Sequence, residues 1–423
     1  YTSGTTGNPK GVMLTTKNLL SGHKNLIAFD EELQQVAGTS ILNSRYPAYL
    51  PMAHLYGYVI NHGLFVSKAR IGLCSPLTML ESSPGNVPGQ VADFALIKPN
   101  FIGGVPLVLD RILKEIYRKL EARNAFAPLL FTYLMDYKIR WTSRGYDTPI
   151  INKVVCQRIN DQFGGQLQTI ICGSAALNER TQAYIQAALN LKLIQGYGTP
   201  VVFKGTEMTA ASHLMAPSDL NYGECGTPLL TFKFYLKDWA EGGYYTTDKP
   251  NPRGEIAGGD CITAGYYHMP EETAECYKVD PDGTRWFESG DIVEVLPDRT
   301  LKVIDRRKDL TKLYNGEFVS LGKIESGLRS SPVVENICVC THPHSNHVTA
   351  IVSPNRRALA DLAASLGKSR ELSSFEEQCT DPDIIAAILR SFDEIGQKLS
   401  YSRKELPVTI TLVEEEWSQD NGL

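Results

Sequence analysis

Three absences narrow what the chain can be. Its nine cysteines include no Cys-x-x-Cys pair, so the sequence predicts neither a disulfide framework nor a zinc knuckle and favours a reducing intracellular compartment. No long basic stretch occurs, and 42 basic against 47 acidic residues make the net charge −5, so we expect no binding to nucleic acid. Uninterrupted apolar runs such as "FIGGVPLVL" (101–109) fall short of the roughly 18 residues that a membrane-spanning helix needs.

The start of the chain lacks two further features. Tyr1 stands where an initiator methionine is expected, and no signal peptide is visible. A Gly/Thr-rich loop begins at once, although domains seldom begin inside a functional loop. We therefore expect a fragment, with any N-terminal anchor or targeting segment outside it. With 423 residues, 43% of them hydrophobic, the chain is long enough for two or three domains with a sizeable core.

The first three hundred residues alternate short apolar runs with helical patterns, which is typical of an α/β domain with a mainly parallel sheet. Apolar residues at helical spacing predict a helix over 107–122. "LQTIICGSAAL" (167–177) predicts a buried strand over 168–172, then a turn and a helix that Asn178 caps. The next strand is expected in "LKLIQGYG" (191–198).

From about residue 222 the pattern changes. Short apolar segments between Gly, Pro and Asp turns predict antiparallel strands in a barrel-like subdomain. After "DRRKDL" (305–310) a third pattern begins, and we place a domain boundary there. Strands are expected over 333–340 and 348–353, and helices near 356–366 and 382–399.

A candidate anion-binding loop opens the chain as "YTSGTTGNPKGV" (1–12). Its glycines allow backbone N–H groups to turn toward an anion, its hydroxyls add donors, and Lys10 supplies positive charge. It is not a Walker A loop, because Pro9 precedes the lysine and Gly11 follows it. A flexible linker is the alternative for an arbitrary Gly/Thr loop, but the Pro-Lys-Gly ending is more specific.

This loop resembles the phosphate loop of the adenylate-forming superfamily, and later segments follow in that family's order. They are "YLPMAHLYGY" (49–58), "CGSAAL" (172–177), "QGYG…TEMT" (195–209), "RGEI" (253–256), "WFESGDI" (286–292) and "LKVIDRRKDLTKL" (301–313). Within the superfamily, "EGGYYTTDKPNPRGEI" (241–256) and "KDLTKLYNGEFVSLGKIE" (308–325) are similar to eukaryotic long-chain acyl-CoA synthetases. The resemblance covers essentially the whole chain.

The resemblance implies an α/β fold of three parts. A large domain (1–305) would contain parallel α/β sheets and a distorted β-barrel, residues 306–310 would form a hinge, and 311–423 would form a small α+β domain. The implied enzyme is a long-chain fatty acid–CoA ligase that uses ATP and Mg²⁺, with CoA as second substrate, and releases AMP and pyrophosphate. Two alternatives stay open: a ligase for another carboxylic acid, and an inactive product that binds nucleotide or partners without turnover.

A membrane setting is also implied by the family alone. The expected location is the cytosolic face of the endoplasmic reticulum or of an organelle membrane. Contact with the membrane surface would occur in the full-length protein, through a segment that is absent from this chain.

The resemblance assigns the nucleotide site to specific residues. Contacts to the β- and γ-phosphates would come from Thr2, Ser3, Gly4, Thr5, Thr6, Gly7 and Lys10. The adenine would lie along Gly173, Ser174 and Ala175, and against Gly196, Tyr197 and Gly198. A close-packed strand-to-helix turn is the bland alternative for 173–175, and both can hold at once.

The catalytic assignments follow in the same way. Glu207 would bind Mg²⁺, because a hard cation prefers a carboxylate. Thr206 would contact the adenylate phosphate, and Lys10 the transferring phosphates. Asp291 suits the ribose hydroxyls, with a plain β-turn as the alternative, and Arg306 would reach ribose or phosphate. Ser289 stands where the family usually has threonine.

The remaining assignments concern the hinge, CoA and the acyl group. Lys308 occupies the hinge position. Gly316 and Glu317 would approach the CoA pantetheine, although "LYNGE" departs from the usual pattern. His54 and Tyr56 would lie near the acyl entry, with a structural histidine as the alternative. "HPHSNH" (342–347) is interpreted as an exposed loop rather than a metal cluster.

Two departures predict weak adenylation by this chain. Removing Pro200 to Gly205 restores the family's "QGYGTTEMT", so residues 200–205 are an insertion that would separate Tyr197 from Glu207. The family's catalytic lysine lies beyond "EEEWSQDNGL", where the chain stops, and Lys404 stands in the wrong context to replace it.

Overall fold

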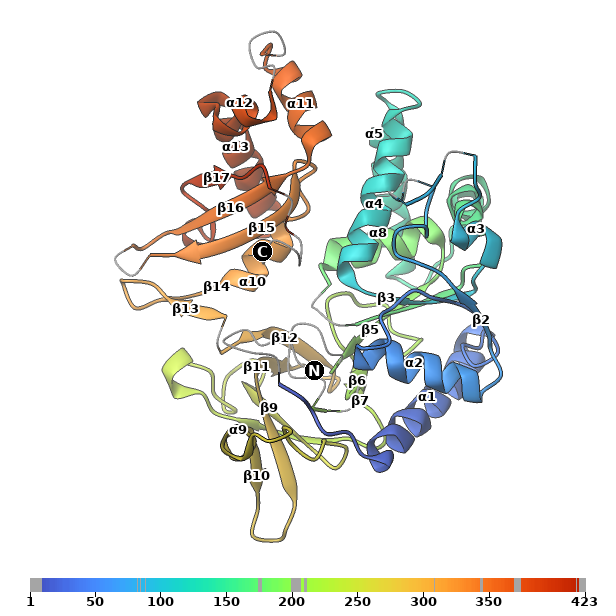
Figure 1. The fold of residues 1–423 in the computed structure, drawn as a ribbon, viewed down its shortest axis with the longest axis vertical. Coiled ribbons are helices and arrows are strands. Elements are labelled where there is room, and N and C mark those ends of the chain that lie inside the picture. Colours follow the sequence, from blue (N-terminus) through green and yellow to red (C-terminus); the bar gives the residue numbers. More distant parts are fainter. Residues whose placement is uncertain are drawn as a thin grey trace. The chain divides into compact units, whose positions relative to one another are not determined.

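The fold consists of two compact units, which Figure 1 shows for the computed structural model. Unit 1 ends at Ile304, and unit 2 begins at Asp305. The structure describes residues 10–81, 83, 85–87, 89–173, 177–198, 207–208, 211–307, 309–342, 345–368, 374–415 and 417.

A mainly parallel sheet lies at the centre of unit 1. Strands β3 (Phe101–Gly104), β4 (Thr169–Cys172) and β5 (Lys192–Tyr197) run parallel. Strands β6 (His213–Leu214) and β7 (Thr227–Pro228) extend the sheet in antiparallel pairing. Every residue of β3 and β4 is buried, as expected for parallel strands that are covered on both faces. The strands predicted over 168–172 and 191–198 are therefore confirmed.

Two helices confirm the patterns that predicted them. Helix α4 (Pro106–Glu121) buries Leu109, Ile112 and Ile116 against the core. Helix α8 (Glu179–Leu189) begins after Asn178, whose side chain accepts hydrogen bonds from the N–H groups of Arg180 and Thr181. This cap satisfies two of the N–H groups that a helix start leaves without partners.

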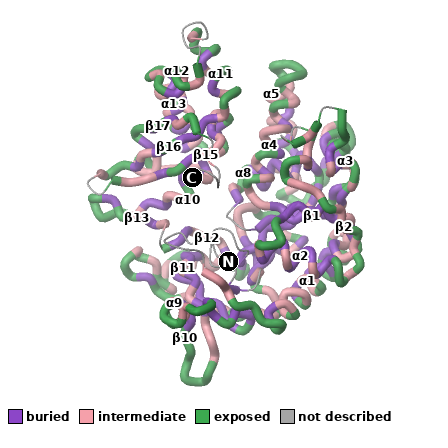
Figure 2. Tube along the Cα trace, viewed as in Figure 1, coloured by how far each residue is buried: buried purple, intermediate pink, exposed green. Residues whose placement is uncertain are grey.

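The other elements of unit 1 complete its core, which Figure 2 shows in purple. Strands β1 (Arg45–Ala48) and β2 (Arg70–Leu73) form a parallel pair. The helices are α1 (Thr16–Ala37), α2 (Leu55–Val66), α3 (Asp93–Ile97), α5 (Ala127–Thr142), α6 (Pro149–Ile151) and α7 (Gln157–Asn160). A short π-helix, Asn152–Cys156, joins α6 to α7.

A second, antiparallel sheet corrects the expected barrel. Its strands are β8 (Lys233–Lys237), β9 (Arg253–Gly259), β10 (Tyr277–Val279), β11 (Arg285–Val295) and β12 (Leu301–Arg306), and α9 (Pro270–Cys276) precedes β10. The strand order is β10-β11-β9-β8, with β12 also on β11, so the described residues form an open sheet rather than a closed barrel. Closure would require the edge strands β10 and β8 to pair with each other, and the described residues show no such pairing. Burial of Phe232, Ile256 and Phe287 in one cluster covers the sheet without closure.

Unit 2 has its own core and an α+β arrangement. Strands β15 (Val334–Thr341) and β16 (Val348–Pro354) are antiparallel, and β17 (Ile410–Leu412) joins β16 in parallel. A hairpin of β13 (Leu310–Lys312) and β14 (Phe318–Ser320) precedes them. The helices are α10 (Leu321–Leu328), α11 (Arg356–Ser365), α12 (Phe375–Thr380) and α13 (Pro382–Lys398). The strands and helices predicted after residue 333 are confirmed.

A helix that crosses a membrane must be both long and apolar. In the part of the chain that the structure describes, no helix combines the length and the apolar character needed to cross a bilayer.

The cap of α8 provides a test of how the fold begins this helix. Replacing Asn178 by alanine should lower the free energy of unfolding by about 1 kcal/mol, because two helical N–H groups lose their acceptor. The measurement is urea unfolding followed by circular dichroism. Asn178→Asp keeps an acceptor oxygen and should remain close to the wild type. An alanine variant as stable as the aspartate variant would contradict the capping role.

Candidate functional site

The site lies where β5 ends. Tyr197 is the last residue of β5, and its carbonyl accepts a hydrogen bond from Ser212 N at 2.8 Å. Gly198 follows with φ +103°, and a Cβ there would lie 2.7 Å from Ser212 N. Only glycine fits this close approach, because a side chain would strain the backbone and displace the next strand.

Tyr197 is fixed by a buried carboxylate. Its hydroxyl donates to Asp291 Oδ2 at 2.5 Å, and both side chains are buried. Burial and then the Asp291 charge raise the pKa of Tyr197 well above its usual value, so the hydroxyl stays protonated and donates. The structure thus joins two residues that the sequence assigned to different parts of the nucleotide, adenine and ribose.

Asp291 stands on an irregularity in β11. The pairing of β11 with β9 shifts between Glu288 and Ile292, and the backbone of Gly290 takes a positive φ. Ser289 Oγ donates to the Ile256 carbonyl at 2.8 Å and accepts from Asp291 N at 3.0 Å. A serine in place of the family's threonine therefore still has the hydroxyl that holds this bend.

A second carboxylate of the bend was not selected from the sequence. Glu255 Oε1 accepts from Gly290 N at 2.9 Å and is itself buried. The sequence signal that could have identified Glu255 is its place in "RGEI" (253–256), one of the segments that carry the family resemblance.

A second tyrosine–carboxylate pair lies in the same cluster. Tyr266 donates its hydroxyl hydrogen to Glu207 Oε1 at 2.6 Å. Lys10 Nζ lies 4.9 Å from the centroid of the Tyr266 ring. Burial, followed by the Glu207 charge, raises the pKa of Tyr266. Tyr266 thus contacts both residues that the resemblance assigned to metal and phosphate: Glu207 through its hydroxyl and Lys10 through its ring.

Backbone contacts explain why these groups meet. The segment after the predicted phosphate loop pairs with residues 264–267: Met13 N donates to the Gly265 carbonyl at 2.9 Å and Tyr267 N to the Gly11 carbonyl at 2.7 Å. On the other side, Thr263 N donates to the Glu207 carbonyl at 2.8 Å. Tyr266 therefore lies on a segment that hydrogen-bonds to residues 11–13 on one side and to Glu207 on the other. Its local sequence does not distinguish this tyrosine from an ordinary aromatic residue of the core.

The two pairs belong to one buried cluster that contains Tyr197, Met208 and Tyr266. Glu207 and Asp291 are each only 1% exposed. A carboxylate is costly to bury without a donor, and each of these has a tyrosine hydroxyl. The arrangement presents fixed oxygen ligands that can accept hydrogen bonds or bind a hard cation.

A buried histidine, His213, packs against Tyr197 and was not among the site residues predicted from the sequence. His213 on β6 is fully buried, and its ring lies edge-on to Tyr197, Phe232 and Phe234. Its Nδ1 lies 3.0 Å from Ser212 Oγ. Burial lowers the pKa of His213 to about 3.

Several predicted nucleotide residues lie outside the described residues. They are Thr2, Ser3, Gly4, Thr5, Thr6, Gly7, Ser174, Ala175, Thr206, the hinge residue Lys308 and the insertion 200–205. Gly173 follows β4, and its N–H donates to the Gly104 carbonyl at 3.2 Å. Gly196 lies within β5, where a Cβ would come 2.7 Å from Leu214.

The two residues predicted for acyl entry lie at the start of α2. The Tyr56 hydroxyl donates to the Ile171 carbonyl at 2.7 Å, and the side chain is buried in the core of unit 1. His54 precedes the helix without a side-chain cap, and its carbonyl accepts from Tyr58 N. Tyr56 thus connects α2 to β4, and its contact with an acyl group stays a prediction.

Unit 2 carries the remaining predicted residues. Arg306 is buried, with Nε 3.9 Å from Asp309 Oδ2. Burial raises the pKa of the neighbouring Asp305 to about 6. Gly316 turns the β13–β14 hairpin with φ +87°, and the exposed Glu317 forms an ion pair with Lys404.

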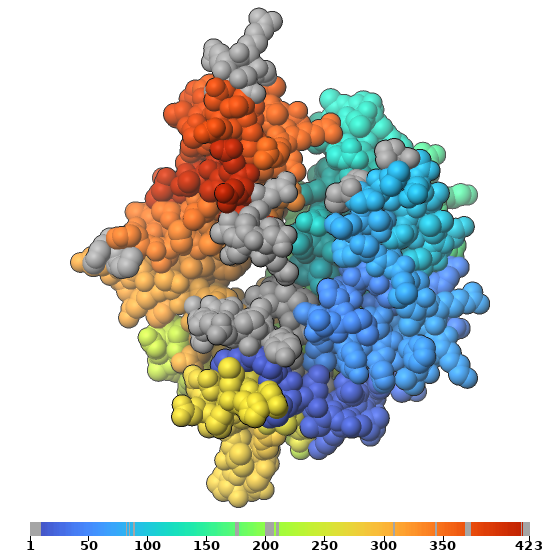
Figure 3. Space-filling model, in the orientation of Figure 1, coloured from blue at the N-terminus to red at the C-terminus, as the bar shows by residue number. Residues whose placement is uncertain are grey.

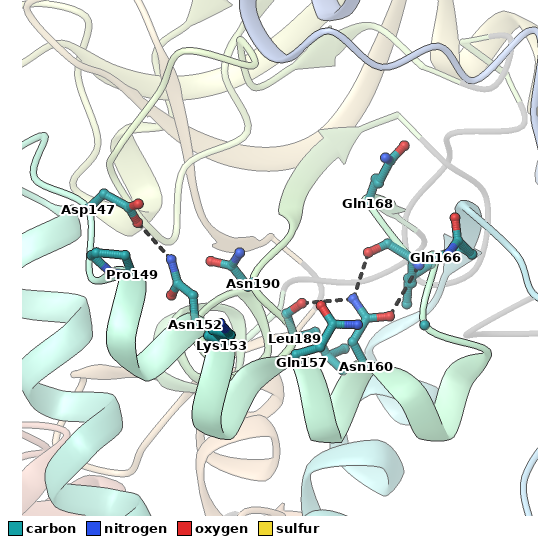
Figure 4. A pocket seen from close by; sticks show the side chains of 12 residues that line it. Asp147, Pro149, Asn152, Lys153, Gln157, Asn160, Gln166, Gln168, Leu189 and Asn190 are labelled. Carbon is teal, nitrogen blue, oxygen red and sulfur yellow. Dashed lines mark hydrogen bonds between the residues drawn. The ribbon is translucent and has the colours of Figure 1, made fainter.

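A polar pocket of about 470 Å³ lies elsewhere in unit 1 (Figure 4). Gln168 and Asn190, which line it, precede β4 and β5, so it lies at the amino ends of these strands and not at the carboxyl ends that hold the site. Two of the lining residues accept hydrogen bonds from the buried Lys138, Asn152 Oδ1 at 2.5 Å and Asn190 Oδ1 at 2.6 Å. Separately, the described residues contain no group of three or more His, Cys, Asp and Glu side chains that could hold a metal ion.

Comparisons with known proteins show the family of the chain. The sequence model of a family described as AMP-binding enzyme matches residues 1–267. Long chain acyl-CoA synthetase 8 of Arabidopsis thaliana is 36% identical over 430 residues, covering 100% of this chain and 58% of that protein. Long-chain-fatty-acid–CoA ligase 2 of Schizosaccharomyces pombe is 30% identical, covering 100% and 59%. The chain therefore spans about three fifths of the length of these relatives.

Solved structures share the fold. The adenylation domain of a carboxylate reductase from Mycobacterium chelonae matches with a TM-score of 0.72 and 26% identity, covering 100% of this chain and 55% of that one. The A domain of a carboxylic acid reductase from Segniliparus rugosus, solved with AMP and a co-purified carboxylic acid, matches at 0.73 and 22%, covering 99% and 56%. The chain thus has the α/β fold of adenylation domains.

The charged hydrogen bond of Tyr266 can be compared with a neutral one nearby. Tyr266→Phe leaves a buried carboxylate short of a donor and should lower the free energy of unfolding by roughly 1.5–3 kcal/mol. Tyr277→Phe removes only a bond to the Thr263 hydroxyl and should cost roughly 0.5–1.5 kcal/mol. Urea unfolding at pH 7 measures both. The geometry would be contradicted if the Tyr277 variant lost as much as the Tyr266 variant.

His213 makes stability depend on pH. Its pKa is lowered in the folded chain to about 3 from 6.5, so below pH 6.5 the unfolded chain binds a proton that the folded chain does not. The free energy of unfolding that the neutral His213 contributes is fully present above pH 6.5. It is lost as pH falls toward 3, by about 1.4 kcal/mol per pH unit. Urea unfolding of wild type and His213→Gln at pH 7.5 and pH 5 should show the wild-type advantage shrinking by about 2 kcal/mol. An advantage independent of pH would exclude a buried neutral histidine.

Proposed function

The chain belongs to the AMP-binding enzyme family, and on that basis we propose that it serves in the ATP-dependent activation of a long-chain fatty acid. The reaction joins the acid to AMP with release of pyrophosphate, and then transfers the acyl group to CoA with release of AMP. The names of the relatives support this substrate class. The observation that carries the proposal is the pair of buried carboxylates, Glu207 and Asp291, each of which accepts a hydrogen bond from a tyrosine hydroxyl of one buried cluster.

The residues present fit a magnesium ion. Glu207 is a hard oxygen ligand that the Tyr266 hydroxyl holds in place, and Lys10 Nζ lies over the ring of the same tyrosine. We assign Mg²⁺ to Glu207, where the ion would neutralise charge on the phosphate oxygens of ATP. Lys10 adds positive charge for the phosphates, and Thr206 is proposed to contact the α-phosphate.

The nucleoside is assigned to the other pair. Asp291 is proposed to accept hydrogen bonds from the ribose hydroxyls, with its orientation set by Tyr197, Ser289 and the bend of β11. Because the Tyr197 hydroxyl is committed to Asp291, its ring is oriented and can pack against the adenine at low entropic cost. Arg306 is the proposed partner for ribose or phosphate.

Unit 2 would supply the second half-reaction. Lys308 is proposed as the hinge residue, and Gly316 and Glu317 as the loop that approaches CoA. His54 and Tyr56 are the proposed residues near the acyl group. Because long acyl chains are poorly soluble in water, we further propose that the longer protein acts at a membrane surface, on the cytosolic face of the endoplasmic reticulum or of an organelle.

A carboxylic acid other than a long-chain fatty acid is the second candidate substrate. The adenylation domains of two carboxylate reductases share the fold, and the fold by itself does not select the acyl group.

Nucleotide binding tests the assignment of Glu207. Isothermal titration with ATP and Mg²⁺ should show roughly tenfold weaker binding for Glu207→Gln, because a charged ligand of the ion is lost. AMP without Mg²⁺ should bind both forms about equally. Glu115→Gln on α4 serves as the matched control and should bind like the wild type. Equal affinity of Glu207→Gln and wild type for Mg²⁺–ATP would remove Glu207 from the metal site.

Pyrophosphate exchange separates the candidate activities. Exchange that depends on a long-chain fatty acid supports the proposed ligase chemistry, and exchange only with short or aromatic acids supports the second substrate class. Nucleotide binding without exchange for any acid would identify the chain as a nucleotide-binding protein without turnover.

A further inference from the structure

Tyr266 contacts two groups of opposite charge with two different parts of its side chain. Its hydroxyl donates to Glu207 Oε1 at 2.6 Å, and the Lys10 ammonium lies 4.9 Å from the centroid of its ring. Both Tyr266 and Glu207 are buried. A tyrosine can contact an anion and a cation at once, because its hydroxyl is a hydrogen-bond donor and the face of its ring is electron-rich.

The backbone of Tyr266 is paired with the segment that carries Lys10. Tyr266 forms an antiparallel bridge with Val12, and hydrogen bonds on both sides of that bridge join residues 11 and 13 to residues 264, 265 and 267. Figure 3 shows the blue surface of the first described residues against the yellow surface around α9. Strand pairing therefore places the backbone of the lysine beside the tyrosine ring.

Helix α9 holds the same segment. Tyr266 N donates to Thr273 Oγ1 at 2.9 Å, and Thr273 lies on α9. Gly265 has a φ of +130°, and a Cβ there would lie 2.6 Å from Thr273 Cγ2, so the backbone packs directly on the helix. The Tyr266 ring meets the Tyr277 ring edge-on, with centroids 6.0 Å apart. Because its backbone and ring are both held, Tyr266 can fix the position of the groups that it contacts.

Glu207 is bound to this segment through its main chain and its side chain. Thr263 N donates to the Glu207 carbonyl at 2.8 Å, and the Tyr266 hydroxyl donates to the carboxylate. A hydrogen bond to one carboxylate oxygen sets the rotation of the group and the direction in which it faces an ion. Loss of such a partner typically lowers metal affinity or activity by roughly 10–100-fold.

We propose that Tyr266 is a positioning residue of the nucleotide site, which orients the Glu207 carboxylate through its hydroxyl and places the Lys10 ammonium through its ring. The proposal rests on the proposed function, in which Glu207 binds the metal ion and Lys10 faces the phosphates. Adenine and ribose are assigned to Tyr197 and Asp291. Tyr266 therefore acts on the binding of Mg²⁺ and the phosphates, and not on the binding of the nucleoside.

Two substitutions separate the hydroxyl from the ring. Tyr266→Phe keeps the ring and should weaken Mg²⁺–ATP binding by up to roughly tenfold in isothermal titration. Tyr266→Leu removes the ring as well and should weaken binding by a further factor of roughly two to five, because the contact with the Lys10 cation is lost. AMP without Mg²⁺ should bind the wild type and both variants about equally. A general loss of the fold would instead weaken the binding of both nucleotides together.

Paired substitutions test whether Tyr266 acts through these two residues. Glu207→Gln/Tyr266→Phe should bind Mg²⁺–ATP like Glu207→Gln alone, since the hydroxyl then has no carboxylate to orient. In a Lys10→Gln background, Tyr266→Leu should bind Mg²⁺–ATP like Tyr266→Phe, since the ring then has no cation to place. Losses that simply add in these backgrounds would overturn the positioning role.

Tyr277→Phe is the matched control. It removes a buried tyrosine hydroxyl from the same cluster, where the partner is the Thr263 hydroxyl at 2.6 Å, and should bind Mg²⁺–ATP like the wild type. A Tyr266→Phe variant that binds like the wild type, or a control as weak as Tyr266→Phe, would overturn the proposal and leave the proposed function in place. A wild-type chain that binds AMP but not Mg²⁺–ATP would overturn the assignments of Glu207 and Lys10, and this proposal with them.

Discussion

The hydrogen bond between Tyr197 and Asp291 is the interaction on which the candidate site depends. It joins the carboxyl end of the parallel sheet to the bend of the antiparallel sheet, across 94 positions of sequence. A carboxylate buried to this extent is stable only with hydrogen-bond donors around it. The parallel sheet supplies the donor, the Tyr197 hydroxyl, and the antiparallel sheet supplies the carboxylate of Asp291. The position of Asp291 is therefore set by β5 as much as by β11.

The same principle organises the second pair. Glu207 is separated from Tyr266 by 59 positions, yet the carboxylate is buried against that hydroxyl. The strand-like segment around Tyr266 also pairs with the residues that follow the phosphate loop. A change at Tyr266 would thus act on Glu207 and, through the backbone, on the stem of the loop. Lys10, whose cation lies over the same ring, belongs to this arrangement.

Unit 1 presents two surfaces of different character. Its site has polar groups buried at the carboxyl ends of the strands, where parallel sheets hold ligands. The outward side of α5 instead exposes Phe126, Leu129 and Tyr133.

The sequence by itself determined the local structure and the family of the site. Apolar spacing predicted α4 and β4, Asn178 predicted the start of α8, and the glycine-rich and acidic motifs indicated nucleotide chemistry, because these signals depend on neighbours within a few residues. Only the tertiary structure decided that Tyr266 meets Glu207, that His213 underlies Tyr197, that Tyr56 bonds the backbone of β4, and that the second sheet stays open. These depend on contacts between distant segments, which arise from burial and pairing that no local pattern encodes.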